Sequence, residues 1–218
     1  MQKEKALCRI NEILSILEKE YPSATKTALN YRTPFELLVA VMLSAQTTDK
    51  QVNKITSNLF QKIKGPEDIL QQGVFWLEKE IRGCGLYRQK SRQIMETCRL
   101  LCEKFGGELP RTRKELLELP GVGRKTANVL LSNLFGIPAF AVDTHVQRVS
   151  RRLGLSQGET PLEVENDLCR LIPLELWSET HHRLIAHGRQ VCRALKPLCS
   201  RCPLRFCCNF AAEKPTSV

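Results

Sequence analysis

Four cysteines near the C-terminus have the residue type and spacing to bind a metal centre. Cys192, Cys199, Cys202 and Cys208 fall within 17 residues and are separated by six, two and five residues. Without a secretory pattern, such a tight group favours a metal site over a disulfide framework. Zinc sites usually pair two short cysteine motifs across a longer insert, whereas this array is compact. The spacing alone leaves zinc and a [4Fe–4S] cluster open.

A second candidate site is the glycine-containing segment at residues 119–127. Gly121 and Gly123 flank Val122 between two expected helices, the first beginning at Thr112 and the second near Gly123. Glycine permits close backbone approach, and amides at a helix start lack intrahelical partners and carry partial positive charge. Such a turn can bind phosphate without a charged side chain. A plain turn between two helices is the alternative interpretation.

Composition and charge limit the class of protein. The 218 residues are 42% hydrophobic and 26% charged, an ordinary globular composition that excludes disordered and fibrous classes. Lys and Arg number 33 against 23 Asp and Glu, and the formal net charge of +10 favours a polyanionic partner such as nucleic acid. The longest apolar run, residues 37–43, is too short to span a bilayer, and no signal-peptide pattern is present. We therefore expect no membrane association and a cytoplasmic location.

The elements that must position these residues are helices. Apolar side chains recur at helical spacing along the chain, and no segment alternates with the period of a strand. Capping-box patterns predict helix starts at Thr33, Thr48, Thr112 and Thr160. A helix is expected to end at Gly83, and the following one at Gly106. The sequence therefore predicts an all-α fold.

Four segments together resemble the endonuclease III family of DNA base-excision glycosylases. They are the glycine turn, the cysteine array, Leu-Ser-Ala-Gln-Thr-Thr-Asp at 43–49 and Ala-Val-Asp-Thr-His-Val at 141–146. The resemblance extends from about residue 34 to residue 208, which is nearly the whole chain. Its motifs are far more specific than a lone Gly-x-Gly.

The family fold has two helical domains with a DNA groove between them. The resemblance places a six-helix domain at residues 25–135, with the helix-hairpin-helix at about 112–131. It places a discontinuous iron–sulfur cluster domain at residues 1–24 and 136–218. Composition marks no linker between them, so these boundaries come from the resemblance.

The resemblance implies a bifunctional DNA glycosylase that also cleaves abasic sites as an AP lyase. Lys125 matches the family lysine that attacks the sugar C1′ of a damaged nucleotide, forms a Schiff base and cuts the strand by β-elimination. The attacking amine must be neutral, and an ordinary lysine has a pKa of about 10.4. A helix dipole contributes only ~0.3–1 kcal/mol, so desolvation must dominate the required lowering of this pKa. A simple phosphate contact is the alternative role for Lys125.

Asp143 matches the family aspartate that assists departure of the base and the proton transfers. It also precedes an expected helix, where an aspartate commonly serves as the N-cap. The two roles are compatible because a capping carboxylate is held rigidly.

The expected substrates are damaged pyrimidines, and the family resemblance favours oxidised pyrimidines among them.

The resemblance also implies residues that open and bind the duplex. Extruding a base leaves a gap, which we expect Gln46 to fill opposite the vacated position while Leu86 acts as an apolar wedge. Further expected DNA contacts are Gly121, Val122, Gly123, Arg124, His145, Arg193, Lys196 and Arg201. The expected partner is double-stranded DNA with damaged bases or abasic sites, bound by a monomer.

The resemblance favours a [4Fe–4S] cluster as the cofactor, held by Cys192, Cys199, Cys202 and Cys208. Cys207 is then a spare thiol beside the last ligand. The basic side chains around the array, which include Arg193, Lys196 and Arg201, predict a rigid loop that contacts phosphates. The cluster is expected to support structure and DNA binding rather than base excision itself.

Several other functions fit parts of this pattern. An adenine-mismatch glycosylase of the same superfamily typically lacks the lysine nucleophile. The presence of Lys125 therefore argues against this class. A pyrimidine-dimer glycosylase is harder to separate. A non-catalytic helix-hairpin-helix module would bind DNA without cutting it, and an iron–sulfur redox sensor would have little affinity for damaged DNA.

Overall fold

The computed structural model describes residues 2–213, with side chains described for residues 9–212. The described residues form α-helices and short 3-10 segments, and no strand occurs among them. The predicted all-α class is therefore confirmed. Contacts divide the chain into two compact units, residues 28–137 and the combination of residues up to 27 with those from 138 onward. Compact contact units are not independently folding domains, so the expected domain boundaries and the groove between them remain predictions.

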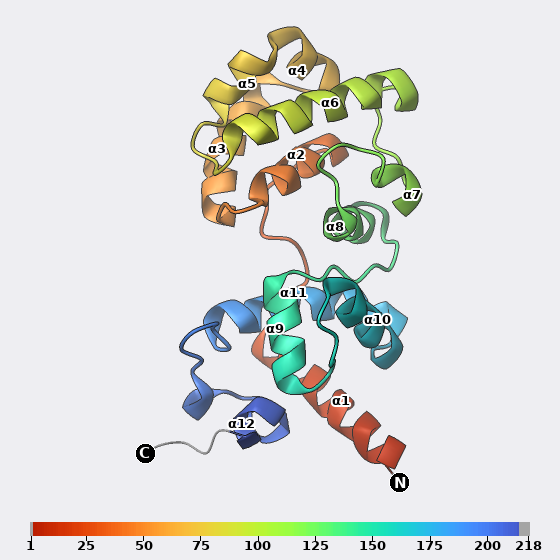
Figure 1. Ribbon diagram of the computed structural model, residues 1–218, viewed down its shortest axis with the longest axis vertical. Helices are drawn as coiled ribbons and strands as arrows, with labels where there is room; N and C mark the ends of the chain where they lie inside the picture. The colour runs from red at the N-terminus through yellow and green to blue at the C-terminus, as the bar shows by residue number, and fades with distance from the viewer. Residues whose placement is uncertain (1, 214–218) are drawn as a thin grey trace. The chain divides into compact units, whose positions relative to one another are not determined.

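The unit at 28–137 is built around α2, which lies beside α6 (Figure 1) and is buried along most of its length. Its α2 is buried at every position from Phe35 to Leu43, and it packs against α3, α6 and α8. A helix that is apolar all round is expected at the centre of a core. The helices of this unit are α2 (Pro34–Ser44), α3 (Asp49–Lys62), α4 (Pro66–Gln72), α5 (Val74–Glu80), α6 (Tyr87–Phe105), α7 (Arg113–Leu116) and α8 (Arg124–Phe135).

The second unit joins the start of the chain to its C-terminal part. Helix α11 packs against both α9 and α1, and Leu17, Phe140, Val149 and Leu184 are buried in the shared core. Its α-helices are α1 (Gln2–Glu20), α9 (Thr144–Leu153), α10 (Pro161–Leu171), α11 (Trp177–Gln190) and α12 (Asn209–Glu213). Its 3-10 segments are η1 (Leu174–Leu176), η2 (Cys199–Arg201) and η3 (Arg205–Cys207).

The predicted helix starts are confirmed in detail. At each of the four predicted caps, the threonine hydroxyl accepts a hydrogen bond from the backbone N–H three residues later. The reciprocal bond that completes a capping box forms between Glu163 and Thr160. Glu36 instead accepts from the backbone N–H of Arg32, one residue before the cap at Thr33. The hydrogen bond to each threonine hydroxyl therefore follows from the local sequence. The hydrogen bonds that the acidic side chains accept differ from one helix start to another.

The segment before Gly83 differs from the expected single helix. Gly73, with φ of 80°, ends α4 and also begins α5. Only glycine adopts this left-handed conformation without steric cost, so the chain turns here and starts a second helix. The predicted helix end at Gly106 is confirmed, because this residue caps α6 with φ of 61°.

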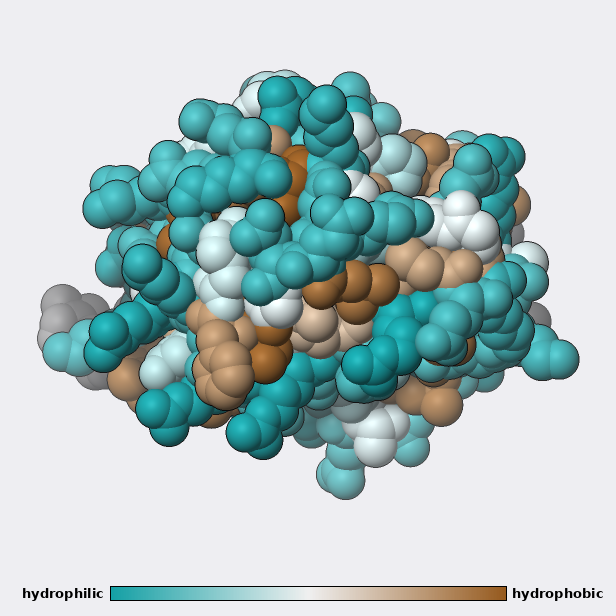
Figure 2. All heavy atoms as spheres, turned by 90° about the horizontal axis from the view of Figure 1, so that it is seen from above, coloured by the Kyte–Doolittle hydropathy of each residue, from teal (hydrophilic) through white to brown (hydrophobic). Residues whose placement is uncertain are grey.

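Hydrophilic side chains cover most of the face drawn in Figure 2, as the charged composition predicts. In the described part of the chain, no helix combines the length and apolar character needed to cross a membrane.

Candidate active site and metal centre

The helix-hairpin-helix turn joins α7 to α8 within one unit. The backbone N–H of Val122 donates to Leu119 O at 3.0 Å, which closes the turn, and the Val122 side chain is buried. Gly123 is the N-cap of α8 and brings no side-chain oxygen to the first-turn amides. These amides point out of the helix start with partial positive charge, the arrangement that binds phosphate.

Two side-chain hydrogen bonds hold the hairpin in place. Thr97 Oγ1 on α6 donates to Pro120 O at 2.7 Å, and Arg113 Nε on α7 donates to Asn128 Oδ1 on α8 at 3.1 Å. Thr97 and Asn128 are both buried. The sequence alone does not reveal these supports, because a lone polar residue at a helical core position carries no local signal of its partner.

Gly121 and Gly123 provide a matched test of the turn. Gly121 has φ of 78°, and a Cβ there would lie 3.1 Å from Gln93 and from Met42 Cε, so Gly121→Ala should lower the free energy of unfolding by about 1–3 kcal/mol. Gly123 has φ of −88°, and a Cβ there would meet open space, so Gly123→Ala should cost less than about 1 kcal/mol. Urea denaturation measures both, and equal losses would contradict this account of the turn.

Lys125 is the second residue of α8, directly after the hairpin. Its side chain is half-buried, and Arg124 before it is exposed. This first helical turn is the end of α8 that carries partial positive charge.

Asp143 is the N-cap of α9, as predicted. Its Oδ1 accepts hydrogen bonds of 2.8 Å from the backbone N–H groups of both His145 and Val146. Two charge-assisted bonds fix the carboxylate in one orientation. Both amides bond the same oxygen, so the cap itself does not occupy Oδ2.

His145 packs beside Asp143 against α11. Its Nδ1 lies 3.1 Å from an Arg148 amino group, and a Cβ on Gly188 would lie 3.1 Å from the His145 Cβ. Burial lowers the pKa of His145, the Asp143 carboxylate opposes this, and Arg148 and Arg189 lower it further. The imidazole is therefore neutral near pH 7. Its expected DNA contact remains a prediction.

Gln46 and Leu86, the two residues expected to fill the gap in the duplex, share an uncommon backbone conformation. They are the non-glycine residues with positive φ in the described part of the chain, at 54° and 58°. Both side chains are exposed, Leu86 to 53%. Their loops touch, because Gly85 N donates to Thr47 Oγ1 at 3.3 Å. The structure thus brings the two predicted insertion residues into adjoining loops of one unit.

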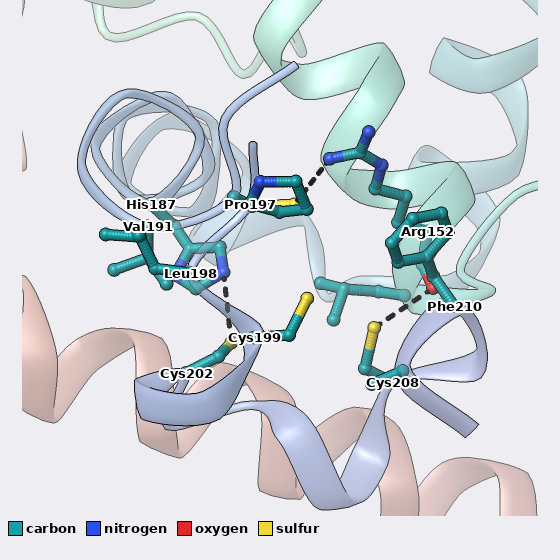
Figure 3. Close-up of a pocket in the computed structure, with 12 residues that line it drawn as sticks. Arg152, His187, Val191, Pro197, Leu198, Cys199, Cys202, Cys208 and Phe210 are labelled. Atoms are coloured by element: carbon teal, nitrogen blue, oxygen red, sulfur yellow. Dashed lines mark hydrogen bonds between the residues drawn. The ribbon is translucent and has the colours of Figure 1, made fainter. Parts of the chain in front are cut away.

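The four cysteines of the predicted metal site line one pocket (Figure 3). Cys202 Sγ lies 3.7 Å from His187 Nε2, while an Arg152 amino group lies 3.5 Å from Cys192 Sγ. Cys208 Sγ lies 3.3 Å from Arg152 O. Cys207 is not among the residues that line this pocket; it is buried, and its backbone carbonyl accepts from Arg9.

The donor set of this pocket suits a bound cationic centre. Burial raises the pKa of Cys202 to about 11, despite a backbone hydrogen bond from Leu204, and it also raises that of Cys208. Ionised thiolates at this depth therefore require a positive charge among them. His187 stays neutral, because burial lowers its pKa to about 4, and its Nδ1 is 2.9 Å from the Tyr21 hydroxyl.

Arginines from α9 hold the loop that carries the cysteines. Arg152 donates to Arg193 O at 2.7 Å and to Ala194 O at 2.9 Å, and Arg148 donates to Cys192 O at 3.1 Å. These anchors lie some 40 residues from their acceptors, so no local sequence pattern reveals them. The basic residues of the loop predicted to contact DNA are exposed, namely Arg193, Lys196 and Arg201.

Comparisons with known proteins agree with this arrangement. The model of the family described as "HhH-GPD superfamily base excision DNA repair protein" matches residues 39–174, which defines a helix-hairpin-helix protein of DNA repair. Endonuclease III of Bacillus subtilis (strain 168) is 54% identical over 85% of each chain. Endonuclease III of Escherichia coli (strain K12) is 45% identical over 96% of this chain and 97% of the relative.

Solved structures of DNA repair proteins are also similar to this chain. A trapped endonuclease III–DNA covalent intermediate is 49% identical, with a TM-score of 0.91, and the match covers 95% of this chain and 97% of that one. A thermostable thymine-DNA glycosylase is 26% identical with a TM-score of 0.83 over 94% of this chain and 98% of that one. The chain belongs to the endonuclease III family, and the resemblance inferred from the sequence is confirmed.

Proposed function

We propose that this protein is a bifunctional DNA glycosylase and AP lyase of base excision repair that removes damaged pyrimidines. The observation that carries the proposal is the position of Lys125, in the first turn of α8 behind a helix-hairpin-helix, in a chain of the endonuclease III family. A trapped covalent complex of a relative with DNA is consistent with an amine nucleophile.

The chemistry begins with the neutral Lys125 amine. Its lone pair attacks C1′, and the bond between C1′ and the base breaks, so that the base leaves with the electron pair and then gains a proton. Loss of a proton from the attached nitrogen and opening of the sugar ring give the Schiff base. Removal of a C2′ proton then expels the 3′ phosphate by β-elimination, and water releases Lys125.

Asp143 would move protons in this sequence. Its Oδ1 is held by two backbone amides of α9, and a carboxylate fixed in this way can accept a proton released in the reaction. A fixed carboxylate also stabilises positive charge that develops on the sugar as the base departs. The same residue thus serves as a structural cap and as the proton acceptor.

The proposed partner is double-stranded DNA containing damaged bases or abasic sites, bound by a monomer in the cytoplasm. First-turn amides of α8 would bind phosphate, while Gln46 and Leu86 would occupy the gap left by the extruded nucleotide. Support for these roles comes from the exposure of both side chains and the contact between their loops. Further proposed contacts are Gly121, Val122, Gly123, Arg124, His145, Arg193, Lys196 and Arg201.

We propose a [4Fe–4S] cluster at Cys192, Cys199, Cys202 and Cys208. These four thiols line one pocket, and the chain belongs to the endonuclease III family. Four thiolates in one compact loop suit a [4Fe–4S] cluster. When bound, the cluster supplies charge and cross-linking that fix the basic loop.

Neighbouring cysteines test this assignment. Cys208→Ala should remove a ligand and lower the iron content and the visible absorbance per chain severalfold, because three thiolates remain. Cys207→Ala should retain both within about 20% of the original, since Cys207 does not line the pocket. Iron analysis and absorbance of the purified variants are the measurements. The opposite pattern would assign the ligand to Cys207.

Borohydride trapping tests the proposed function directly. The protein should form a covalent adduct with duplex DNA containing an abasic site, because borohydride reduces the Schiff base to a stable amine. A panel of duplexes with defined lesions should then show cleavage at oxidised pyrimidines, and preference for dimers would identify the related pyrimidine-dimer class. Tight binding without any adduct would leave a non-catalytic DNA-binding module.

A further inference from the structure

Lys90 is a buried lysine that none of the proposed chemistry uses. It lies in the first turn of α6, and only 4% of its surface is exposed. Its Nζ donates to Leu43 O at 2.7 Å, to Ala45 O at 2.5 Å and to Thr47 Oγ1 at 3.1 Å. An ammonium group has the three N–H donors that these three contacts use. Burial lowers the pKa of Lys90, and the neighbouring Cys84 opposes this.

The ammonium group closes the C-terminal end of α2. The last carbonyls of a helix lack intrahelical donors, and a cation there also interacts favourably with the helix dipole. Lys90 satisfies Leu43 O and the cap residue Ala45 O, and Thr47 N donates to Ser44 O at 3.2 Å. Residues 44–47, which we call the Gln46 loop, are thus fixed by a side chain from another helix.

Thr47 extends this connection to the turn at residues 83–86, which we call the Leu86 turn. Its hydroxyl oxygen lies 3.1 Å from Lys90 Nζ and accepts from Gly85 N at 3.3 Å. The two backbones are close, because a Cβ on Gly85 would lie 3.1 Å from Gln46 O. Gly85 therefore permits the contact, and Thr47 joins both loops to one ammonium group.

Both loops hold strained residues that need such support. Gln46 and Leu86 have φ of 54° and 58°, a backbone region that is strained for residues other than glycine. Strain of this kind persists only where surrounding contacts fix it, and it is concentrated at functional sites. Lys90 contacts the Gln46 loop directly and lies four residues after Leu86, whose carbonyl accepts from Lys90 N at 3.0 Å.

We propose that Lys90 is a positioning residue, which holds the Gln46 loop and the Leu86 turn together so that both side chains enter the duplex as one unit. This inference rests on the proposed function, in which Gln46 and Leu86 fill the gap left by the extruded nucleotide. Lys90 itself touches neither DNA nor the reacting atoms. It acts through the backbone carbonyls and the hydroxyl that it bonds.

The direct test compares Lys90→Met with the unchanged protein in the insertion step. A duplex with an uncleavable tetrahydrofuran abasic analogue opposite 2-aminopurine reports insertion as a change in fluorescence. We expect the insertion rate to fall at least about tenfold in Lys90→Met, because misplaced groups lose rate steeply. Borohydride trapping on single-stranded abasic DNA, which has no stack to fill, should stay within about twofold. Insertion within twofold, or equal loss in both assays, would overturn the proposal.

Two further sets of variants keep the test decisive. Lys104→Met, on the exposed part of the same helix, removes an ion pair with Glu118 and should leave insertion unchanged. Thr47→Val should reproduce the Lys90→Met defect, while Thr47→Ser, which keeps the hydroxyl, should insert normally. The double variant Lys90→Met/Thr47→Val should be no slower than either single variant, since both break one connection. Multiplied defects would contradict a shared network.

The failure of this inference is distinguishable from failure of the proposed function. If the unchanged protein formed no borohydride adduct with abasic DNA, the lyase assignment would fail whatever the insertion assay showed. If the adduct formed and Lys90→Met inserted normally, the positioning role alone would fail.

Discussion

Lys125→Ala should abolish strand cleavage and the borohydride adduct. We expect kcat on abasic duplex DNA to fall by at least about 10³-fold, because removal of a nucleophile closes the entire covalent pathway. DNA binding should weaken only modestly, since the hairpin amides and the other basic residues remain. The measurement combines single-turnover cleavage with trapping on the same duplex.

The matched control for this prediction is Lys114→Ala. Lys114 is an exposed lysine on α7, in the same hairpin, and its removal lowers the net charge by the same amount. It should raise KM slightly at low salt and leave kcat within about twofold, the behaviour of a peripheral charge. If Lys125→Ala behaved like Lys114→Ala, the amine would be a phosphate contact and not the nucleophile.

Local chemistry explains which parts of the fold were predictable. The threonine caps at Thr33 and Thr160 and the glycine cap at Gly106 act within five residues, so short patterns identify them. Gly73 was missed as a helix boundary because one glycine inside an apolar pattern does not reveal its φ. The helices on either side of it, α4 and α5, both pack on α6, and such long-range contacts leave no local pattern in the sequence.

In the candidate site, too, local patterns were predictable and contacts that depend on tertiary packing were not. The spacing of the four cysteines predicted a metal centre, and the structure gathers all four in one pocket. The arginine that contacts Cys192 Sγ comes from position 152, and the buried ammonium beneath the Gln46 loop comes from position 90. Such partners depend on tertiary packing, and neither Arg152 nor Lys90 differs in its sequence context from an ordinary helical surface cation.

Asp143→Asn should separate the two roles of Asp143. Asparagine is as good an N-cap as aspartate, so the amides of His145 and Val146 keep an acceptor and the free energy of unfolding should change by less than about 1 kcal/mol. An amide does not accept the proton that a carboxylate accepts, so base removal should slow by about 10²-fold or more. Thermal unfolding and single-turnover glycosylase assays are the measurements.

Asp143→Ala completes this comparison because it removes the cap and the carboxylate together. It should lose as much activity as Asp143→Asn and also about 1 kcal/mol of stability. Activity would then follow the carboxylate, and stability would follow the oxygen that accepts from α9. If the asparagine variant stayed active and the alanine variant did not, activity would instead depend on the orientation of α9. Asp143 would then be a cap alone, and proton transfer would require another group.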